Sequence, residues 1–256
     1  MASYYDSGRG SFLSAIPVVT KNLLIINLLL WVATFVMSGK GIDLNRYLAL
    51  HFWQGSDFNL AQMVTYMFMH DTSSVQSGFL HIFCNMFNLW MFGVVLERTF
   101  GARRYLLYYL VCGVGAALVQ ELVWQLSWVN DVAGLLGMST GQAEQLINSS
   151  SIGDLPMFLN NAYLTVGASG AVFGILLAFG MTFPNLPMYI IPFPFPIKAK
   201  WMVMGYGAVE LIFGVTGSMS GVAHFAHLGG MLFGFLLILY WKRNGMTGGS
   251  GYGYMG

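Results

Sequence analysis

Six long apolar stretches divide this sequence, and they restrict the chain to a small set of folds. They cover residues 18–37, 79–96, 105–124, 164–183, 201–217 and 222–241. A helix needs about 20 mostly apolar residues to cross a bilayer, and all six stretches reach or approach that length. Charged residues make up only 8% of the 256, too few to cover the surface of a soluble domain of this size. We therefore expect an all-α membrane protein with six transmembrane helices.

The composition excludes several other classes of protein. A hydrophobic content of 56% excludes disorder and collagen, and a net charge of +1 offers no basic surface for nucleic acid. Cys84 and Cys112 both lie inside apolar stretches. They are expected to be small buried side chains, not a disulfide or a metal site. The first stretch is long and lacks a clear cleavage site, so it is predicted to be a membrane helix and not a signal peptide.

The basic residues predict an orientation. With six spans, both termini share one side with the connections after the second and fourth spans. All of the 11 Lys and Arg residues except Lys40 and Arg46 fall on that side. The positive-inside rule therefore predicts that both termini are cytoplasmic. The expected parts are a cytoplasmic N-terminal segment, 1–17, a membrane domain, 18–241, and a Gly-rich cytoplasmic tail without fixed structure, 242–256.

The connections between the stretches differ in character. Residues 38–78, on the predicted outer side, contain aromatic side chains and are expected to pack on the membrane surface. Residues 125–161, on the same side, are rich in Gly, Asn and Ser, and their role is left open. Residues 184–197 hold five of the seven prolines. Proline disrupts helices, so a short stiff loop is predicted there.

Polar side chains inside the apolar stretches mark candidate functional residues, because they are costly in lipid. The second stretch carries His81 and Asn85, the fourth carries Ser169 and the sixth carries His227. In the predicted orientation all four lie at a similar depth near the outer surface. His81 and Asn85 are four residues apart, so they share one face of a helix.

Two pairs of glycines predict how the fourth and sixth stretches meet. The pairs are Gly170 with Gly174, and Gly230 with Gly234. This spacing lets two helix backbones approach closely in lipid. If the two stretches pack through their glycines, Ser169 comes within reach of His227, and the two side chains form an activated nucleophile. The residues alone leave a simpler interpretation open, in which the serine packs and the histidine bonds another helix.

The segments around these residues resemble the rhomboid intramembrane serine proteases. GASGAVFG (167–174) is similar to the family's G-x-S-G nucleophile motif, and HIFCN (81–85) is similar to its H-x-x-x-N motif. AHLGGMLFG (226–234) is similar to its A-H-x-x-G-x-x-x-G motif. The order of the motifs and the number of spans also match. The resemblance covers about residues 18–241 and implies a rhomboid-like bundle of six helices.

The resemblance implies a role for each candidate residue. Ser169 would be the nucleophile and His227 the general base, in a dyad without an acidic third member. The main-chain N–H of Ser169 and the side chains of His81 and Asn85 would form the oxyanion hole. Phe173 would pack on the base. The supporting glycines would be Gly167, Gly170, Gly230 and Gly234.

The implied reaction is peptide-bond hydrolysis through an acyl-enzyme, in or near the transmembrane helices of single-span membrane-protein substrates. The expected surroundings are a lipid bilayer, in the simplest case the bacterial cytoplasmic membrane, with the site open to the outer face. The first outer connection and the fifth span would govern substrate access. No cofactor, metal or nucleic acid is expected, and the sequence assigns no oligomeric state or specific substrate.

The chain departs from the family pattern in its first outer connection. Many members carry a Trp-Arg pair shortly before the second span, whereas AQMVTYMFMH (61–70) contains neither residue. The usual anchor of that connection is therefore missing. His224 shares a helix face with His227, one turn outward. It is expected to be a surface histidine at the water interface, with tuning of the base or binding of substrate as its functional alternative. Glu210 is expected to be a neutral or hydrogen-bonded carboxyl facing the protein, with a proton path as its functional alternative.

Two other functions stay open. A transporter could use His81, His224, His227 and Glu210 as a relay, and an inactive rhomboid-like protein could bind other membrane proteins. A zinc protease of the H-E-x-x-H type is excluded because that motif is absent from the sequence. A di-aspartyl intramembrane protease is excluded because no predicted span contains an aspartate.

Overall fold

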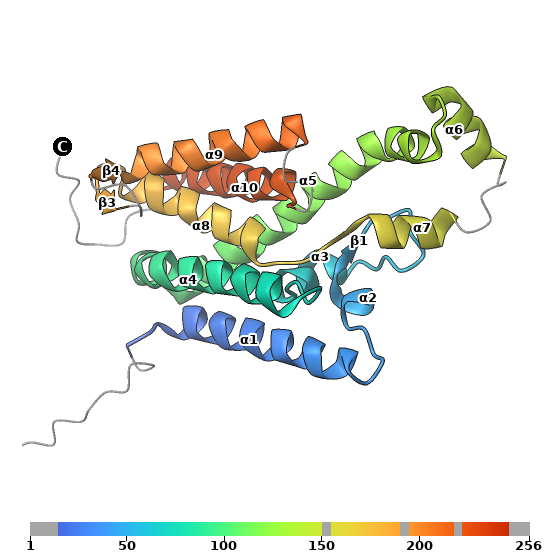
Figure 1. Ribbon diagram of the computed structural model, residues 1–256. Coiled ribbons are helices and arrows are strands. Elements are labelled where there is room, and N and C mark those ends of the chain that lie inside the picture. Colours follow the sequence, from blue (N-terminus) through green and yellow to red (C-terminus); the bar gives the residue numbers. More distant parts are fainter. Residues whose placement is uncertain (1–14, 150–154, 190–194, 218–221, 246–256) are drawn as a thin grey trace, which may run out of the picture.

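The computed structural model describes residues 15–149, 155–189, 195–217 and 222–245 (Figure 1). Six long helices dominate this part of the chain: α1 (Val18–Ser38), α4 (Val75–Phe100), α5 (Ala102–Leu136), α8 (Ser169–Thr182), α9 (Ala199–Thr216) and α10 (His224–Arg243). The shorter elements are α2 (Asn45–Leu48), β1 (Leu50–His51), α3 (Gln62–Thr65), the 3-10 helix η2 (Tyr66–Phe68), α6 (Thr140–Asn148), α7 (Leu155–Ala162), β2 (Leu164–Thr165), β3 (Pro187–Tyr189) and β4 (Pro196–Lys198).

Four of the long helices, α1, α4, α5 and α10, are long and apolar enough to cross a membrane, judged over the described residues. Their outward faces are apolar, as lipid requires: Leu29 of α1 is 63% exposed and Leu80 of α4 is 61% exposed. α8 has 14 residues. At 1.5 Å per residue it rises about 21 Å, less than the hydrocarbon thickness of about 30 Å. The helical bundle is thus established with four candidate spans, and α8 and α9 complete it.

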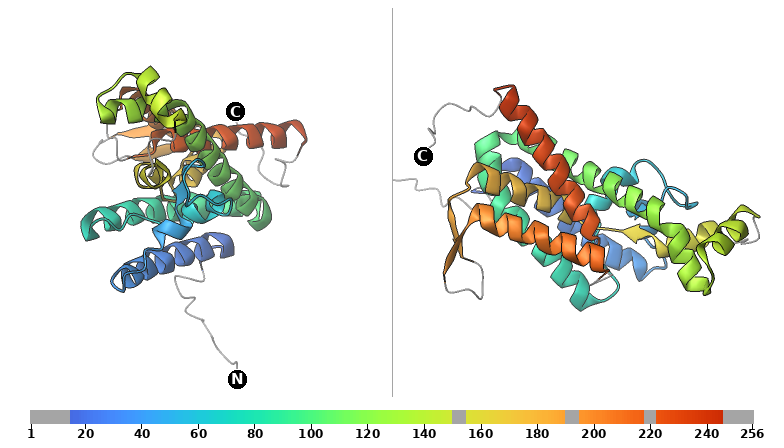
Figure 2. Two further views of the ribbon diagram at one scale, coloured as in Figure 1. Left: turned by 90° about the vertical axis from the view of Figure 1, so that its right-hand side faces the viewer. Right: turned by 90° about the horizontal axis from the view of Figure 1, so that it is seen from above.

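The helices form one bundle with α4 between α1 and α8 (Figure 1). α10 packs against α5, α8 and α9 (Figures 1 and 2). α5 crosses the bundle obliquely and continues past the other long helices towards α6. It supplies three fully buried aromatic side chains, those of Tyr105, Tyr108 and Tyr109. The Tyr108 hydroxyl donates to the Gly174 carbonyl at 2.8 Å, which satisfies a polar group that lipid would leave unpaired.

α8 and α10 meet backbone to backbone along the glycine seam, which consists of Gly170, Gly174 and Gly230. A Cβ atom on Gly230 would overlap the main-chain carbonyl of Gly170. A Cβ atom on Gly174 would lie 3.1 Å from the Gly230 carbonyl oxygen and would also overlap the Cys112 thiol of α5. Gly234 faces α5 instead, where a Cβ atom would overlap the Tyr108 hydroxyl. The predicted contact between the fourth and sixth stretches is therefore confirmed, and its closeness depends on glycine.

The segment before α8 is extended and not helical. β2 pairs antiparallel with β1, which joins it to the connection between α1 and α4. The predicted fourth span, 164–183, is therefore wrong at its start, because α8 begins only at Ser169. The main-chain groups before Ser169 bond to another part of the chain and are not available to a helix. This pairing fixes the place where α8 begins.

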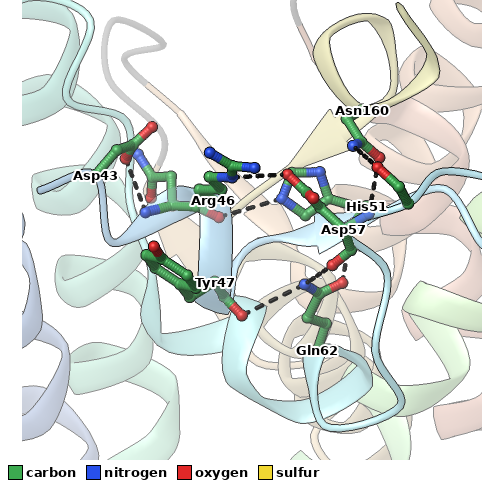
Figure 3. Close-up of polar contacts among 9 residues, drawn as sticks. Asp43, Arg46, Tyr47, His51, Asp57, Gln62 and Asn160 are labelled. Carbon is green, nitrogen blue, oxygen red and sulfur yellow. Dashed lines mark hydrogen bonds and ion pairs between the residues drawn. The ribbon is translucent and has the colours of Figure 1, made fainter. Parts of the chain in front are cut away.

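The connection between α1 and α4 is held by Gln62, which is fully buried (Figure 3). Its amide oxygen accepts hydrogen bonds from the main-chain N–H groups of His51 and Asn59, each at 3.3 Å. Its amide nitrogen donates to the carbonyls of Asp57, at 2.8 Å, and Tyr47, at 3.3 Å. One side chain thus ties together four points of the connection. Gln62 supplies an anchor in the stretch that lacks the Trp-Arg pair.

Charged and amide side chains strengthen the same connection (Figure 3). Arg46 and Asp57 form an ion pair with 2.9 Å between Nε and Oδ2. Asn160, at the end of α7, donates from Nδ2 to the Ser56 hydroxyl at 2.8 Å and accepts at Oδ1 from the main-chain N–H of Asp57 at 3.2 Å. These bonds join α7 to the connection between α1 and α4.

The predicted irregular connection 125–161 is largely helical. α5 continues to Leu136, well beyond the predicted third span, 105–124. α6 then begins at a capping box in which Ser139 and Gln142 bond each other's main-chain N–H groups. This Ser-x-x-Gln pattern is a helix-start signal that the sequence contains. The structure does not describe residues 150–154.

The described residues are mostly helical, as the predicted all-α fold requires, but they also contain two short sheets of two strands each. β3 and β4 pair antiparallel within the connection 184–197, with Pro187 opposite Lys198. Proline fits such a pair because every strand of a two-stranded sheet is an edge strand. The expected stiff loop is thus a hairpin where it is described, and residues 190–194 lie outside the described part. Most of the predicted N-terminal segment, 1–17, and of the tail, 242–256, also lies outside it.

Candidate active site

Ser169 is the first residue of α8, and the main-chain conformation at Gly167 determines how the chain enters this helix. Gly167 has a φ of 131°, which disfavours any side chain. A Cβ atom there would lie 2.9 Å from Nε2 of His81. The N–H of Gly167 donates to the Tyr66 carbonyl at 3.0 Å, which holds the turn in place. As the first helical residue, Ser169 directs its own N–H away from any intrahelical acceptor.

The hydroxyl of Ser169 meets the imidazole of His227, which lies on the first turn of α10. Ser169 Oγ and His227 Nε2 are 2.8 Å apart, a hydrogen-bond distance. The Phe173 ring stacks on the imidazole, with the ring centroids 4.3 Å apart and an angle of 8° between the planes. His227 is 7% exposed. The glycine seam brings the two helices close enough for this contact, and Phe173 fixes the plane of the imidazole.

The carboxyl of Glu210, from α9, lies on the other side of the imidazole. Its Oε2 is 2.9 Å from Nδ1 of His227 and 2.7 Å from Nδ1 of His224. The expectation that the base lacks a carboxylate partner is therefore wrong. His224 is also not a surface histidine, because it is buried. His224 and His227 are three residues apart on one face of α10, and α9 packs on that face, so one carboxyl reaches both rings.

His81 and Asn85, on α4, lie across the site from α10. The main-chain N–H of Asp71 points at Nδ1 of His81, 3.4 Å away. Because an N–H can only donate, this network assigns Nδ1 as the acceptor and leaves the proton on Nε2, the atom that borders Gly167. Asn85 donates one amide hydrogen to the His81 carbonyl at 3.0 Å, and its amide retains a second one. Both side chains thus offer N–H donors near Ser169.

These groups surround a cavity of about 670 Å³ between α4, α8, α9 and the β2 segment. Its polar lining includes Asp71, Ser77, His81, Asn85, Asn88, Ser169 and His227. Cys84 also lines it and is exposed, so the expectation that both cysteines are buried holds for Cys112 alone. The cavity places Ser169 in a space that both water and a peptide can occupy.

Asp71 gives the cavity a negative charge at its edge, in the loop before α4. Partial burial raises the pKa of the Asp71 carboxyl, but hydrogen bonds from Ser77 and Ser73 outweigh that effect and leave the pKa below its ordinary value. The Ser77 hydroxyl donates at 2.7 Å and the Ser73 N–H at 2.8 Å. Asp71 is therefore ionised at neutral pH.

The profile of the rhomboid domain matches residues 57–244, which is well over half of the chain. This chain belongs to the rhomboid family. RHOMBOID-like protein 1 of Arabidopsis thaliana is 28% identical over 64% of this rhomboid and 31% of its own length. Rhomboid protease AarA of Providencia stuartii is 27% identical over 64% of this chain and 51% of its own length. This rhomboid thus spans 31% to 51% of the length of these relatives. It is an integral membrane protein.

Glu210, His224 and His227 are the described residues of this rhomboid that could hold a metal ion, with ligand atoms within 4.8 Å of one another. Zinc ligands at about 2.1 Å in a tetrahedron lie roughly 3.4 Å apart. The distances of 2.7 and 2.9 Å between the carboxylate oxygen and the two nitrogens are shorter than that. They fit hydrogen bonds directly between the three side chains.

This rhomboid brings together the four polar residues singled out in its sequence: Ser169, His227, His81 and Asn85. Phe173 and the supporting glycines lie at the contacts that hold them. The sequence placed His224 on the same helix face as His227 but did not predict that the Glu210 carboxyl contacts both rings. Glu210 did stand out as an acid within an apolar stretch, and it is a hydrogen-bonded carboxyl facing the protein, as expected.

Proposed function

We propose that this rhomboid is a serine endopeptidase that hydrolyses peptide bonds in or near the transmembrane helices of membrane proteins. The proposal rests on the 2.8 Å between Ser169 Oγ and His227 Nε2, at the wall of a cavity. A hydrogen-bonded imidazole can take the hydroxyl proton as the oxygen attacks. The relative AarA carries the name of a protease, which supports the same reaction.

The reaction begins when Ser169 Oγ attacks the carbonyl carbon of the scissile bond. The hydroxyl proton passes to Nε2 of His227, and the carbonyl oxygen becomes an oxyanion. The N–H of Ser169, Nε2–H of His81 and an amide hydrogen of Asn85 stabilise that oxyanion. The C–N bond then breaks, and the amine leaves with the proton from His227. Water repeats these steps on the acyl-enzyme, which releases the acid and restores Ser169.

The proposal extends to the arrangement in the membrane. Residues 18–241 form a six-span domain in which α8 and α9 act as the fourth and fifth spans. The excess of basic residues on one side supports an orientation with both termini in the cytoplasm and the cavity on the outer face. The membrane we propose is the bacterial cytoplasmic membrane. The substrates are single-span membrane proteins, and the chemistry needs no cofactor.

The test is covalent capture and cleavage by the purified protein. The wild type should react with a fluorophosphonate probe at Ser169 and should cleave a single-span reporter in liposomes. Ser169→Ala should abolish both activities, because the nucleophile is lost. Ser38→Ala, at an exposed position at the end of α1, is the matched control and should retain both.

Three outcomes would contradict the proposal. Cleavage by Ser169→Ala near the wild-type rate would show that Ser169 is not the nucleophile. Ion or proton flux in liposomes without labelling of Ser169 would identify a transporter. Binding of membrane proteins with neither labelling nor cleavage would identify an inactive relative.

A further inference from the structure

The carboxyl of Glu210 has no part in the reaction as described, yet it is tied to the base. One oxygen, Oε2, lies within hydrogen-bond distance of two imidazole rings, those of His227 and His224. Its side chain is 12% exposed. A carboxylate in such a place is costly unless donors satisfy it. Two ring N–H groups on one oxygen meet that requirement.

The contact with Glu210 determines which nitrogen of His227 carries the proton. An ionised carboxylate can only accept, so Nδ1 of His227 must be the donor. In the neutral ring Nε2 is then unprotonated and presents its lone pair to the Ser169 hydroxyl, 2.8 Å away. This is the form that a general base needs. The opposite tautomer would place a hydrogen on Nε2, which could then not take the proton of the serine hydroxyl.

Stacking on Phe173 leaves this choice open. Two parallel rings 4.3 Å apart fix the plane of the imidazole, but the imidazole can still turn within that plane. A directional hydrogen bond at Nδ1 removes that freedom. Phe173 and Glu210 therefore constrain different motions of the same ring.

We propose that Glu210 is a positioning residue, the third member of a Ser169–His227–Glu210 triad, and that His224 holds Glu210 in place as a second donor. This inference rests on the proposed protease function. When the serine proton moves to Nε2, the Nδ1 proton stays on His227 and continues to bond Glu210. The carboxylate stays ionised throughout and stabilises the positive imidazole without taking its proton.

The packing of α9 explains why a second donor is needed. Its buried residues, Ala199, Met202 and Val203, all lie near its start. Glu210 lies beyond them, where side chains such as Ile212 are 56% exposed. This part of α9 meets α10 through side chains at its edge, such as Phe213 against the His224 ring, and not through a buried helix face. The bond from His224 fixes the carboxyl while His227 carries out proton transfer.

The experiment compares Glu210→Gln, Glu210→Asp and the wild type in cleavage of a single-span reporter. Glu210→Gln keeps the size of the side chain and removes its charge. We expect kcat to fall about 10²-fold, the lower end of the range for acid–base groups, with KM unchanged. Glu210→Asp keeps the charge on a shorter chain and should recover part of kcat. Glu144→Gln makes the same chemical change on exposed α6 and should match the wild type.

A small fluorophosphonate separates activation of the serine from binding of a helical substrate. Its rate of reaction with Ser169 should fall in Glu210→Gln in parallel with kcat, because the probe needs the activated hydroxyl but not the substrate site. The probe also shows whether the variant is folded, since any labelling at Ser169 requires the assembled site.

His224 is tested by a pair of substitutions. His224→Ala removes the second donor, and kcat should fall threefold to tenfold, about the effect of one hydrogen bond. His224→Asn places an amide nitrogen near the position of Nδ1 and should restore most of that loss. Equal activity in both variants would remove His224 from the proposal.

The outcomes distinguish failure of the triad proposal from failure of the proposed protease function. If Glu210→Gln keeps the wild-type kcat while Ser169→Ala is inactive, the triad is wrong and the protease stands. If Glu210→Gln and Glu210→Asp lose activity equally, Glu210 has a structural role and the triad is wrong. A wild-type protein that neither cleaves nor labels overturns both proposals.

Discussion

α10 meets α8 and α9, two of the helices it packs against, in different ways. Against α8, the glycine seam places main chain on main chain, and a Cβ atom on Gly230 would overlap Gly170. Against α9, contact depends on long side chains, and Glu210 spans the gap to two histidines. The distance between Ser169 and His227 is thus set by two backbones. The position of Glu210 is set by bonds that a single substitution can remove.

This difference separates the expected effects of substitutions into two kinds. A change in the glycine seam moves whole helices, so it should reduce both stability and activity. A change in a side-chain contact leaves the helices in place, so it should reduce activity alone. Substitutions in the glycine seam and in the side-chain contacts can test this difference.

Gly230→Ala should have the largest effect. The added methyl group must push α10 away from α8, and such overpacking typically costs about 1–3 kcal/mol. A shift near 1 Å at the reacting atoms costs about 10²-fold in rate. Thermal unfolding in detergent should show a lower Tm, and reporter cleavage should fall at least that far.

Gly205→Ala on α9 is the matched control. A Cβ atom there meets no heavy atom within 4 Å among the described residues, so both Tm and cleavage should stay close to the wild type. Wild-type Tm and rate in Gly230→Ala would contradict the close backbone contact and the comparison built on it.

His81→Ala and Asn85→Ala should have the next largest effect. They should lower activity and leave stability unchanged. Each removes one proposed donor to the oxyanion, and the loss of such a donor costs about 10²–10³-fold in kcat. Asn148→Ala, at an exposed position at the end of α6, is the control and should keep the wild-type kcat. Tm should be unchanged in all three variants, whereas kcat should fall in His81→Ala and Asn85→Ala alone. A large fall in Tm for Asn85→Ala would make its role structural.

His70 should show the reverse, an effect on stability without a part in the chemistry. Burial, and next the neighbouring His81, lower the pKa of His70 to about 3. An unfolded chain takes up a proton on this ring below about pH 6.5, and the folded protein does so only near pH 3. Stability is therefore complete above pH 6.5 and falls as the pH decreases towards 3, by up to about 1.4 kcal/mol per unit.

The measurement is the difference in Tm between pH 7 and pH 5 within each variant, which cancels any general loss of stability. His70→Leu should show a smaller difference than the wild type, because the titrating ring is gone. The same difference in both proteins would show that His70 does not cause the acid sensitivity.

Sequence patterns predicted the parts of this fold that depend on one helix at a time. Residues four apart share a face, so His81 pairs with Asn85 and each glycine pair forms one stripe. The contact of Ser169 with His227 followed from matching those stripes. The approach of Glu210 to α10 depends on how two helices are rotated about their axes. No spacing along one chain records that rotation, so the contact could not be predicted.

The start of α8 shows a second limit of sequence patterns. Leu164 and Thr165 are apolar enough to continue the helix, and periodicity gave no reason to end it there. Their pairing with β1, more than 100 residues earlier, decides the outcome. In the same way Gln62 is an ordinary polar residue in the sequence, and only its four hydrogen bonds identify it as an anchor.

The shortness of α8 has a consequence for the surrounding lipid. If its far end reaches one face of the hydrocarbon layer, a rise of about 21 Å leaves Ser169 about 9 Å short of the opposite face. Longer acyl chains would deepen that gap, whereas a thin bilayer would bring the hydroxyl closer to the headgroups. Hydrophobic mismatch thus gives the host membrane a direct influence on how fast a buried peptide bond can be reached by water.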